Sequence, residues 1–275
     1  MNPRAVAAWS AAALTIVLVA NHPVYRALVI LLAINFMVAR KRPGRQLGGL
    51  LRILLFATVV AVGVSMLLSH AGAHVLFVIP HQVPGLAGPV TLESAVFGLA
   101  SGIGLSAAAL AAAPLSLVVD PHQVVDALPR SLERAGATIA AALNMVPGIG
   151  RSYGAIRDAQ SVRGWRPRGP RSYAEVLVPL VLTSMESSIQ LAEAMEARAF
   201  GSGHRTRWMP EPWRTGDLMV VLTAAAATLV FIAARVTGLV ADWYPYPVPT
   251  VPLVNPLALA GVLLLLTPML VPRHD

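Results

Sequence analysis

The chain lacks cysteine, and its single lysine is Lys41. Without cysteine, disulfides and thiolate metal sites are excluded. A P-loop needs Gly-Lys followed by serine or threonine, and because Arg40 precedes Lys41, ATP hydrolysis of this type is excluded. Charged residues are also scarce, at 12% of 275 residues, whereas a soluble domain has about 25%. Together with 56% hydrophobic residues, this scarcity indicates an integral membrane protein.

Six apolar runs are candidates for membrane helices. The two N-terminal runs have about 16 residues each, slightly fewer than the roughly 20 that cross a bilayer, and predict a tight helical hairpin. Because the first run lacks a small-residue cleavage site and a second follows at once, we expect a retained span and not a signal peptide. Residues 70–89 hold no lysine or arginine but several prolines and glycines, which predicts a loop with 75–79 as a candidate re-entrant piece. The six runs are 5–20, 24–39, 47–69, 92–119, 217–240 and 257–271.

The distribution of basic residues predicts the orientation. With the N-terminus inside and six crossings, the inner side receives Arg4, the basic cluster at 40–52, every arginine from 130 to 214, and Arg273. Positive charge accumulates in cytoplasmic loops, so we expect a multi-pass protein of the cytoplasmic membrane with both termini in the cytoplasm. The membrane also accounts for the net charge of +8, and nucleic acid is not an expected partner. The predicted organisation is 1–119 with four spans, 120–216 in the cytoplasm and 217–275 with two spans.

The stretch 129–208 is the only long part that a bilayer would reject. Its periodicity predicts amphipathic helices over 126–146 and 149–162, interrupted at Pro147, and a third over 173–200. The third helix carries glutamates in its second half, and carboxylates are costly in hydrocarbon, so it is expected to return along the membrane surface. The predicted fold class is an all-α membrane protein with about six spans and a cytoplasmic domain of three amphipathic coupling helices. The expected packing stripe of the third helix is Met185, Ile189, Ala192 and Met195.

Two short arginine-centred segments end the second and third predicted helices. Neither Arg163 nor Arg198 has a carboxylate three or four residues earlier to pair with, so each is expected to reach outward, at a helix end whose dipole favours a cation. Gly164 supplies a helix stop after the first. The alternative interpretation is that both arginines are further positive charges of a cytoplasmic loop. The segments read Ser161-Val162-Arg163-Gly164 and Glu196-Ala197-Arg198-Ala199.

Residues 158–164 (DAQSVRG) and 192–200 (AEAMEARAF) resemble the paired Ala-Arg-Gly signatures of the T component of energy-coupling factor (ECF) transporters, a family that includes the cobalt permease Q subunit. The resemblance implies a membrane scaffold whose helices dock on two cytoplasmic ABC ATPase subunits, with one signature arginine entering each. It also implies a separate small membrane protein that captures a vitamin or a metal ion. The signatures depart from the family pattern in reading Val-Arg-Gly and Ala-Arg-Ala. The implied docking residues are Arg163, Gly164, Ala197, Arg198 and Ala199, supported by Val162 and Glu196.

The predicted function is therefore transmission of ATPase movement to a substrate-capture protein in an ABC-type ECF importer of vitamins or transition metals. No residue is assigned a catalytic role and no cofactor is expected, because ATP hydrolysis falls to the partner ATPases. One alternative is a self-contained secondary transporter, which needs ionisable residues facing a pathway, and Arg235 is the only obvious one. The other is a membrane-embedded enzyme, which needs a metal or an acid–base cluster.

Three histidines, His70, His74 and His81, are candidates for a metal role. The spacing of His70 and His74 could hold a metal if this segment were helical. No nearby aspartate or glutamate in the sequence completes a site with them or with His81, so loop polarity is the favoured interpretation and no metal site is predicted. The basic run 163–171 is expected to contact protein or anionic lipid, and the two uses are compatible.

Overall fold

The computed structural model describes residues 1–40, 45–79, 88–120, 122–123, 133–200 and 213–270. The chain divides into two compact units, Met1–Asp120 together with Pro212–Asp275, and Pro121–Glu211. Each unit is described by itself. Helices make up most of both, and the predicted class, an all-α membrane protein, is confirmed.

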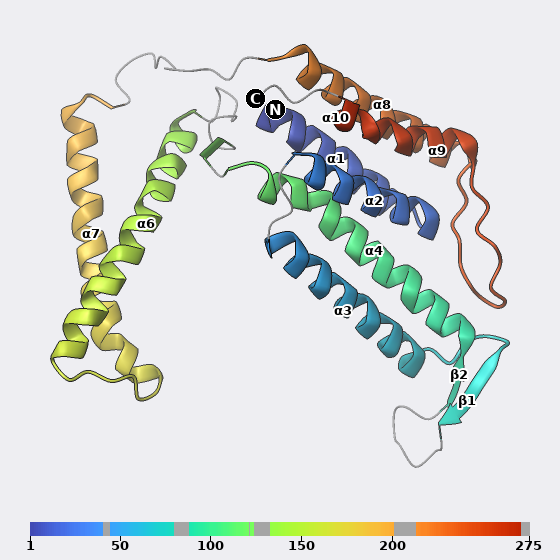
Figure 1. Ribbon diagram of the computed structural model, residues 1–275, viewed down its shortest axis with the longest axis horizontal. Helices are drawn as coiled ribbons and strands as arrows, with labels where there is room; N and C mark the ends of the chain where they lie inside the picture. The colour runs from blue at the N-terminus through green and yellow to red at the C-terminus, as the bar shows by residue number, and fades with distance from the viewer. Residues whose placement is uncertain (41–44, 80–87, 121, 124–132, 201–212, 271–275) are drawn as a thin grey trace. The chain divides into compact units, whose positions relative to one another are not determined.

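The first unit is a bundle of apolar helices (Figure 1). Three helices are long and apolar enough to cross a membrane, at Gln46–Leu68, Leu92–Leu117 and Thr215–Val236, while Pro3–Val19, Pro23–Ala39 and Pro256–Leu270 form shorter apolar helices. The six predicted runs therefore all fold as helices, and the two N-terminal ones are short, as expected. The elements are α1 (Pro3–Val19), α2 (Pro23–Arg40), α3 (Arg45–Leu68), α4 (Leu92–Leu117), α8 (Thr215–Val236), α9 (Pro256–Leu263), η3 (Leu264–Leu266) and α10 (Thr267–Leu270).

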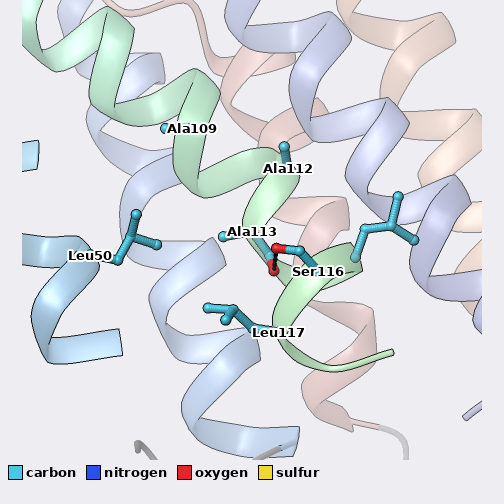
Figure 2. A pocket seen from close by; sticks show the side chains of 7 residues that line it. Leu50, Ala109, Ala112, Ala113, Ser116 and Leu117 are labelled. Atoms are coloured by element: carbon cyan, nitrogen blue, oxygen red, sulfur yellow. Dashed lines mark hydrogen bonds between the residues drawn. The ribbon is translucent and has the colours of Figure 1, made fainter. Parts of the chain in front are cut away.

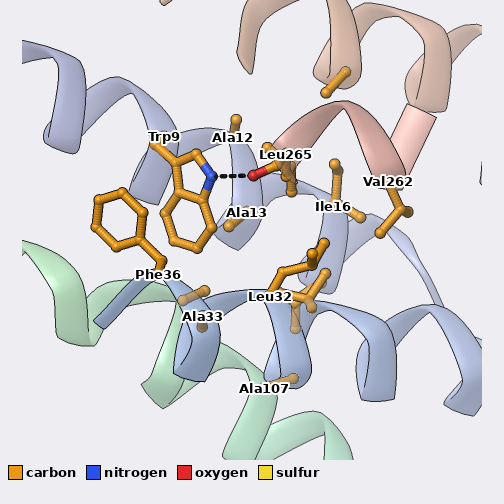
Figure 3. Close-up of a cluster of buried hydrophobic side chains, with 14 of the residues drawn as sticks. Trp9, Ala12, Ala13, Ile16, Leu32, Ala33, Phe36, Ala107, Val262 and Leu265 are labelled. Carbon is orange, nitrogen blue, oxygen red and sulfur yellow. Dashed lines mark hydrogen bonds between the residues drawn. The ribbon is translucent and has the colours of Figure 1, made fainter. Parts of the chain in front are cut away.

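The core of this unit lies where α1 packs on α2, α4 and α8. Trp9 of α1 is 1% exposed, and its ring stacks on Phe36 of α2 with 4.7 Å between ring centroids. Its indole Nε1 donates a hydrogen bond of 2.9 Å to the carbonyl oxygen of Leu265 (Figure 3). The Trp9 side chain is thus packed in the core with its one polar atom hydrogen-bonded, and it connects α1 to η3 near the C-terminus.

Helices α3 and α4 approach closely because α4 presents glycine at the contact. A Cβ at Gly98 would lie 2.7 Å from Cα of Val62, and a Cβ at Gly102 would lie 2.9 Å from Cα of Thr58. The Thr58 and Ser106 hydroxyls are 3.1 Å apart in a hydrogen bond across the same interface. Small residues and hydroxyl bonds of this kind are the usual means of helix association in lipid.

The prediction of a re-entrant piece at 75–79 is wrong, because these residues form a strand. Strand β1 (Val75–Ile79) pairs antiparallel with β2 (Gly88–Thr91), with Val78 opposite Pro89. The Val-Leu-Phe-Val-Ile run is rich in β-branched and aromatic residues, which favour strands, and pairing satisfies backbone groups that a five-residue helix would leave open.

The second unit is a pair of long helices. Helix α6 (Glu133–Val162) is followed by the short η2 (Pro170–Tyr173) and by α7 (Ala174–Ala197), and α6 packs on α7. The predicted break at Pro147 is wrong, since α6 continues through it. A proline removes one intrahelical bond and a long helix can absorb this by bending. The expectation of three coupling helices is corrected to two long ones among the described residues, and residues 126–132 of the first predicted helix lie outside them.

Candidate functional site

Helices α6 and α7 form an antiparallel hairpin (Figure 1). Near the turn, the Gln160 side-chain amide donates to the carbonyl oxygen of Glu175 at 3.4 Å, and further along, the Ser188 hydroxyl reaches Sδ of Met145 at 3.9 Å. Arg163 therefore lies at the turn and Arg198 at the far end of α7. At about 1.5 Å per residue, the 24 residues of α7 separate these two ends by about 36 Å.

The first arginine segment closes α6 with a Schellman motif. The amide of Trp165 donates to the carbonyl oxygen of Gln160 at 3.0 Å, and the amide of Gly164 donates to that of Ser161 at 3.0 Å. Gly164 has a φ of 84°, in the left-handed region that this motif requires and that glycine adopts without strain. The prediction that Gly164 stops the helix is confirmed, and it leaves the Val162 side chain 90% exposed beside Arg163.

The second arginine segment closes α7 with the same pair of hydrogen bonds. The amide of Phe200 donates to the carbonyl oxygen of Met195 at 3.0 Å, and the amide of Ala199 donates to that of Glu196 at 2.9 Å. Ala199 adopts a φ of 54°, so it holds the left-handed position without being glycine. The two segments thus share one geometry in which an arginine occupies the helix cap, a left-handed residue follows, and an aromatic residue comes next. The departure from glycine at Ala199 leaves the sharp end of the helix intact.

Among the described residues, the two hairpin ends differ in the charged side chains next to the arginines. The turn end carries Arg163, Arg166, Arg168 and Arg171, all exposed. Trp165 gives this end a fixed shape, because its Nε1 donates to the carbonyl oxygen of Ser172 at 2.9 Å. The far end places Arg198 beside exposed glutamates, Glu193 and Glu196. None of the ion pairs in the described part of the chain involves Arg163 or Arg198.

The predicted packing stripe of α7 is wrong with respect to α6. The side chains that α7 buries are Val176 and Leu180, whereas Met185 and Ile189 are 58% and 57% exposed. At 100° per residue, Val176 and Leu180 lie on the face opposite Met185 and Ile189. Of the predicted stripe, only Met195 is half-buried. Sequence periodicity identified an apolar face, but not which of the two faces meets α6.

Many of the side chains in the middle of the α6–α7 interface are small or polar. They border a cavity of about 470 Å³ between the two helices. Gly148 lines this cavity from the α6 side, and a Cβ built there would meet nothing within 4 Å. The lining includes Met145, Ile149, Ser152, Thr183, Ser184 and Ser187.

A second pocket, of about 380 Å³, lies at the ends of α3 and α4 (Figure 2). Leu50 of α3 faces alanines and Leu117 of α4 across it, and the Ser116 hydroxyl is bonded to the Ala113 carbonyl oxygen at 3.1 Å. The lining holds no titratable side chain, so this pocket offers packing space and no chemistry.

The histidines of the 70–89 stretch lie in a different setting from the one the sequence indicated. His70 and His74 precede β1 and are not helical, and Nδ1 of His74 is 2.7 Å from Oε1 of Glu93. Sequence reasoning missed Glu93 as a neighbour because it is 19 residues away and comes close only through the β-hairpin. The Glu93 side chain is fully buried and also accepts hydrogen bonds from the backbone amides of Ala73 and His74.

These contacts make Glu93 an anchor for the segment before β1. No group of three or more histidine, aspartate or glutamate side chains that could hold a metal occurs among the described residues. His81 lies outside the described residues. The His74–Glu93 pair is therefore interpreted as structural.

Taken together, the apolar bundle and the separate two-helix unit define a helical membrane protein. The family model described as CbiQ, cobalt transport protein, matches residues 1–208. The chain belongs to this family, and so is a membrane component of cobalt or ECF-type transport. A search of curated proteins finds no match. The matched range includes both arginine segments, and the docking roles of Arg163, Gly164, Ala197, Arg198 and Ala199, with Val162 and Glu196 in support, stay predictions.

Proposed function

We propose that this protein is the transmembrane coupling subunit of an ABC-type ECF importer in the cytoplasmic membrane. In this proposal the α6–α7 hairpin and both chain termini face the cytoplasm. Two ATPase subunits grip the hairpin, and their closure moves the bundle that holds a separate membrane protein for substrate capture. Membership of the cobalt transport family favours a transition-metal ion as the substrate over a vitamin.

The observation that carries the proposal is the shared cap geometry of Arg163 and Arg198 at opposite ends of one hairpin. A single groove cannot hold two side chains about 36 Å apart along a helix, so the arrangement suits two ATPases that each receive one arginine. Both guanidinium groups are exposed, and neither is neutralised by an ion pair among the described residues. Each is therefore free to enter an acidic socket.

The charge difference between the two ends adds to this proposal. Four arginines at the turn favour a strongly acidic surface, which is either a partner groove or anionic lipid. Among the described residues at the far end, Glu193 and Glu196 lie next to Arg198, and they favour a more neutral partner surface there. The two ATPase contacts are accordingly expected to differ in salt sensitivity, with the Arg163 contact weakening first as ionic strength rises.

The alternative interpretation as a secondary transporter depends mainly on Arg235, and this side chain is paired. Nη2 of Arg235 is 2.6 Å from Oδ2 of Asp242, and Nη1 donates to the carbonyl oxygen of Val240 at 2.8 Å. Arg235 is thus paired at the end of α8, which argues against a role for it in a transport pathway.

The test replaces Arg163 and Arg198 with alanine, singly and together, and measures how much ATPase co-purifies with the tagged chain. Removing one partner of a buried charge pair costs about 2–5 kcal/mol, so each single variant is expected to weaken one contact by at least about 30-fold. The double variant should lose both ATPases and transport. Arg157→Ala is the matched control, because Arg157 is exposed on α6 and paired with Asp158 at 3.3 Å. Retention of both ATPases with unchanged uptake in the double variant would refute the docking assignment.

The absence of cysteine gives a direct test of sidedness. Arg163→Cys and Arg198→Cys each introduce the only thiol, which an impermeant maleimide can label in intact cells or in inverted vesicles. Both positions are expected to react only in inverted vesicles. Reaction from opposite sides would leave no common face for the ATPases.

A further inference from the structure

Arg26 lies in an unusual place for a charged side chain. It belongs to the first turns of α2, and its guanidinium group rests against α4 at Gly104, where a Cβ would come within 2.8 Å of Nη1 and 3.1 Å of Cζ. Residue 104 is near the middle of the candidate span Leu92–Leu117, about 18 Å from either end at 1.5 Å per residue. Because Gly104 has no side chain, the Arg26 guanidinium group fits against α4 near the middle of this helix.

This cation has no anionic partner within the described part of the chain. Nε of Arg26 is buried and has no hydrogen-bond partner, and none of the ion pairs among the described residues includes Arg26. A charged side chain at the centre of a span is costly, and such residues usually face a partner or a polar cavity.

The backbone around Arg26 is also partly non-helical. The amide of Trp243 donates to the carbonyl oxygen of Asn21 at 3.0 Å, and the amide of Asn255 donates to the Tyr25 hydroxyl at 2.8 Å. The loop between α8 and α9 is thereby held on the short turn between α1 and α2. Non-helical backbone at membrane depth is tolerated where protein or a water-filled cavity covers it.

His22, in the same turn, is 3% exposed and stacks beside Tyr25. Neither of its ring nitrogens has a hydrogen-bond partner in the described structure. The turn therefore offers a second unsatisfied polar side chain near a half-buried arginine.

We propose that Arg26 binds a carboxylate carried by a membrane helix of a partner subunit. Gly104 lies inside the candidate span Leu92–Leu117, where a carboxylate on a neighbouring membrane helix can meet Arg26 directly, whereas a lipid phosphate lies at the membrane surface and is distinguished by the experiment below. A carboxylate on a membrane helix needs a cation at the same depth, and intramembrane charges pair with one another. The inference rests on the proposed function, because the substrate-capture protein is the membrane partner that the proposal supplies.

The experiment measures which subunits co-purify with the tagged chain in the full complex. Arg26→Gln is expected to reduce the retained membrane partner at least about tenfold and to leave both ATPases bound. Gly104→Ala, which fills the seat of the guanidinium group, should act in the same direction. The matched control is Gly63→Ala, since a Cβ at Gly63 meets nothing within 4 Å. Arg26→Lys, which keeps the charge, should retain more partner than Arg26→Gln.

A charge exchange makes the test independent of folding. Arg26→Asp should release the membrane partner, and an arginine in place of one intramembrane carboxylate of that partner should restore binding. The inference is overturned if no exchange restores binding, if Arg26→Gln retains the partner as the unaltered chain does, or if it instead removes a phospholipid detected by native mass spectrometry. The docking proposal fails separately: if the double variant of Arg163 and Arg198 keeps both ATPases while Arg26→Gln releases the membrane partner, the docking assignment is wrong and the role of Arg26 stands.

Discussion

The left-handed residue after each arginine gives a reciprocal test of the two helix ends. Ala199 has a φ of 54° and Gly164 a φ of 84° at the same position of the same motif. A left-handed conformation costs a residue with a Cβ about 1–2 kcal/mol, and glycine offsets about 0.4–1 kcal/mol of this through the entropy of the unfolded chain. We expect Ala199→Gly to stabilise the end of α7 by about 1 kcal/mol, and Gly164→Ala to destabilise the end of α6 by about the same amount.

Hydrogen exchange measures this change locally. One kcal/mol is about a fivefold change in the opening equilibrium, so the amide of Phe200, bonded to the Met195 carbonyl oxygen, should exchange about five times more slowly in Ala199→Gly. The amide of Trp165 should exchange about five times faster in Gly164→Ala. Steric effects do not confuse the second variant, because a Cβ at Gly164 meets nothing within 4 Å. Faster exchange of Phe200 in Ala199→Gly would refute the shared cap geometry.

Two further predictions concern the membrane unit. Gly98→Ala should destabilise the membrane unit by about 1–3 kcal/mol, because the added methyl group overpacks the contact with α3. Gly63→Ala is the control and should be neutral or stabilising, because a Cβ there meets nothing within 4 Å. Equal melting temperatures of the two variants in detergent would contradict this packing. Glu93→Gln should lower the melting temperature, and the backbone amide of His74, which donates a hydrogen bond to Glu93, should exchange faster. Unchanged exchange of this amide would argue against Glu93 as the anchor of the segment before β1.

Local sequence signals predicted the helices of this protein well. Apolar runs located the six membrane-unit helices to within a few residues, and Gly164 marked the end of α6. Two local signals misled. Pro147 indicated a break that α6 does not have, because a long helix with packing along one face tolerates a lost hydrogen bond. The run 75–79 indicated a membrane insertion, and a pairing partner at 88–91 made it a strand.

The candidate site was only partly predictable. The two arginines and the residues around them stand out in the sequence, and so does their position at helix ends. Their separation could not be predicted, since it depends on the antiparallel register of α6 and α7, in which Gln160 meets Glu175. The face of α7 that meets α6 could not be predicted either, because both faces contain apolar residues at helical spacing.

Composition and local pattern were enough to show that this protein is a membrane protein, to locate its apolar helices, and to identify the two arginines at helix ends. These properties follow from composition and from neighbours within one or two turns, which physical chemistry constrains locally. The tertiary structure alone decided that His74 meets Glu93, that Gly104 seats Arg26, and that the two arginines lie at opposite ends of one hairpin. Such contacts join residues far apart in the chain, and they depend on how whole helices and strands pack, which no local pattern encodes.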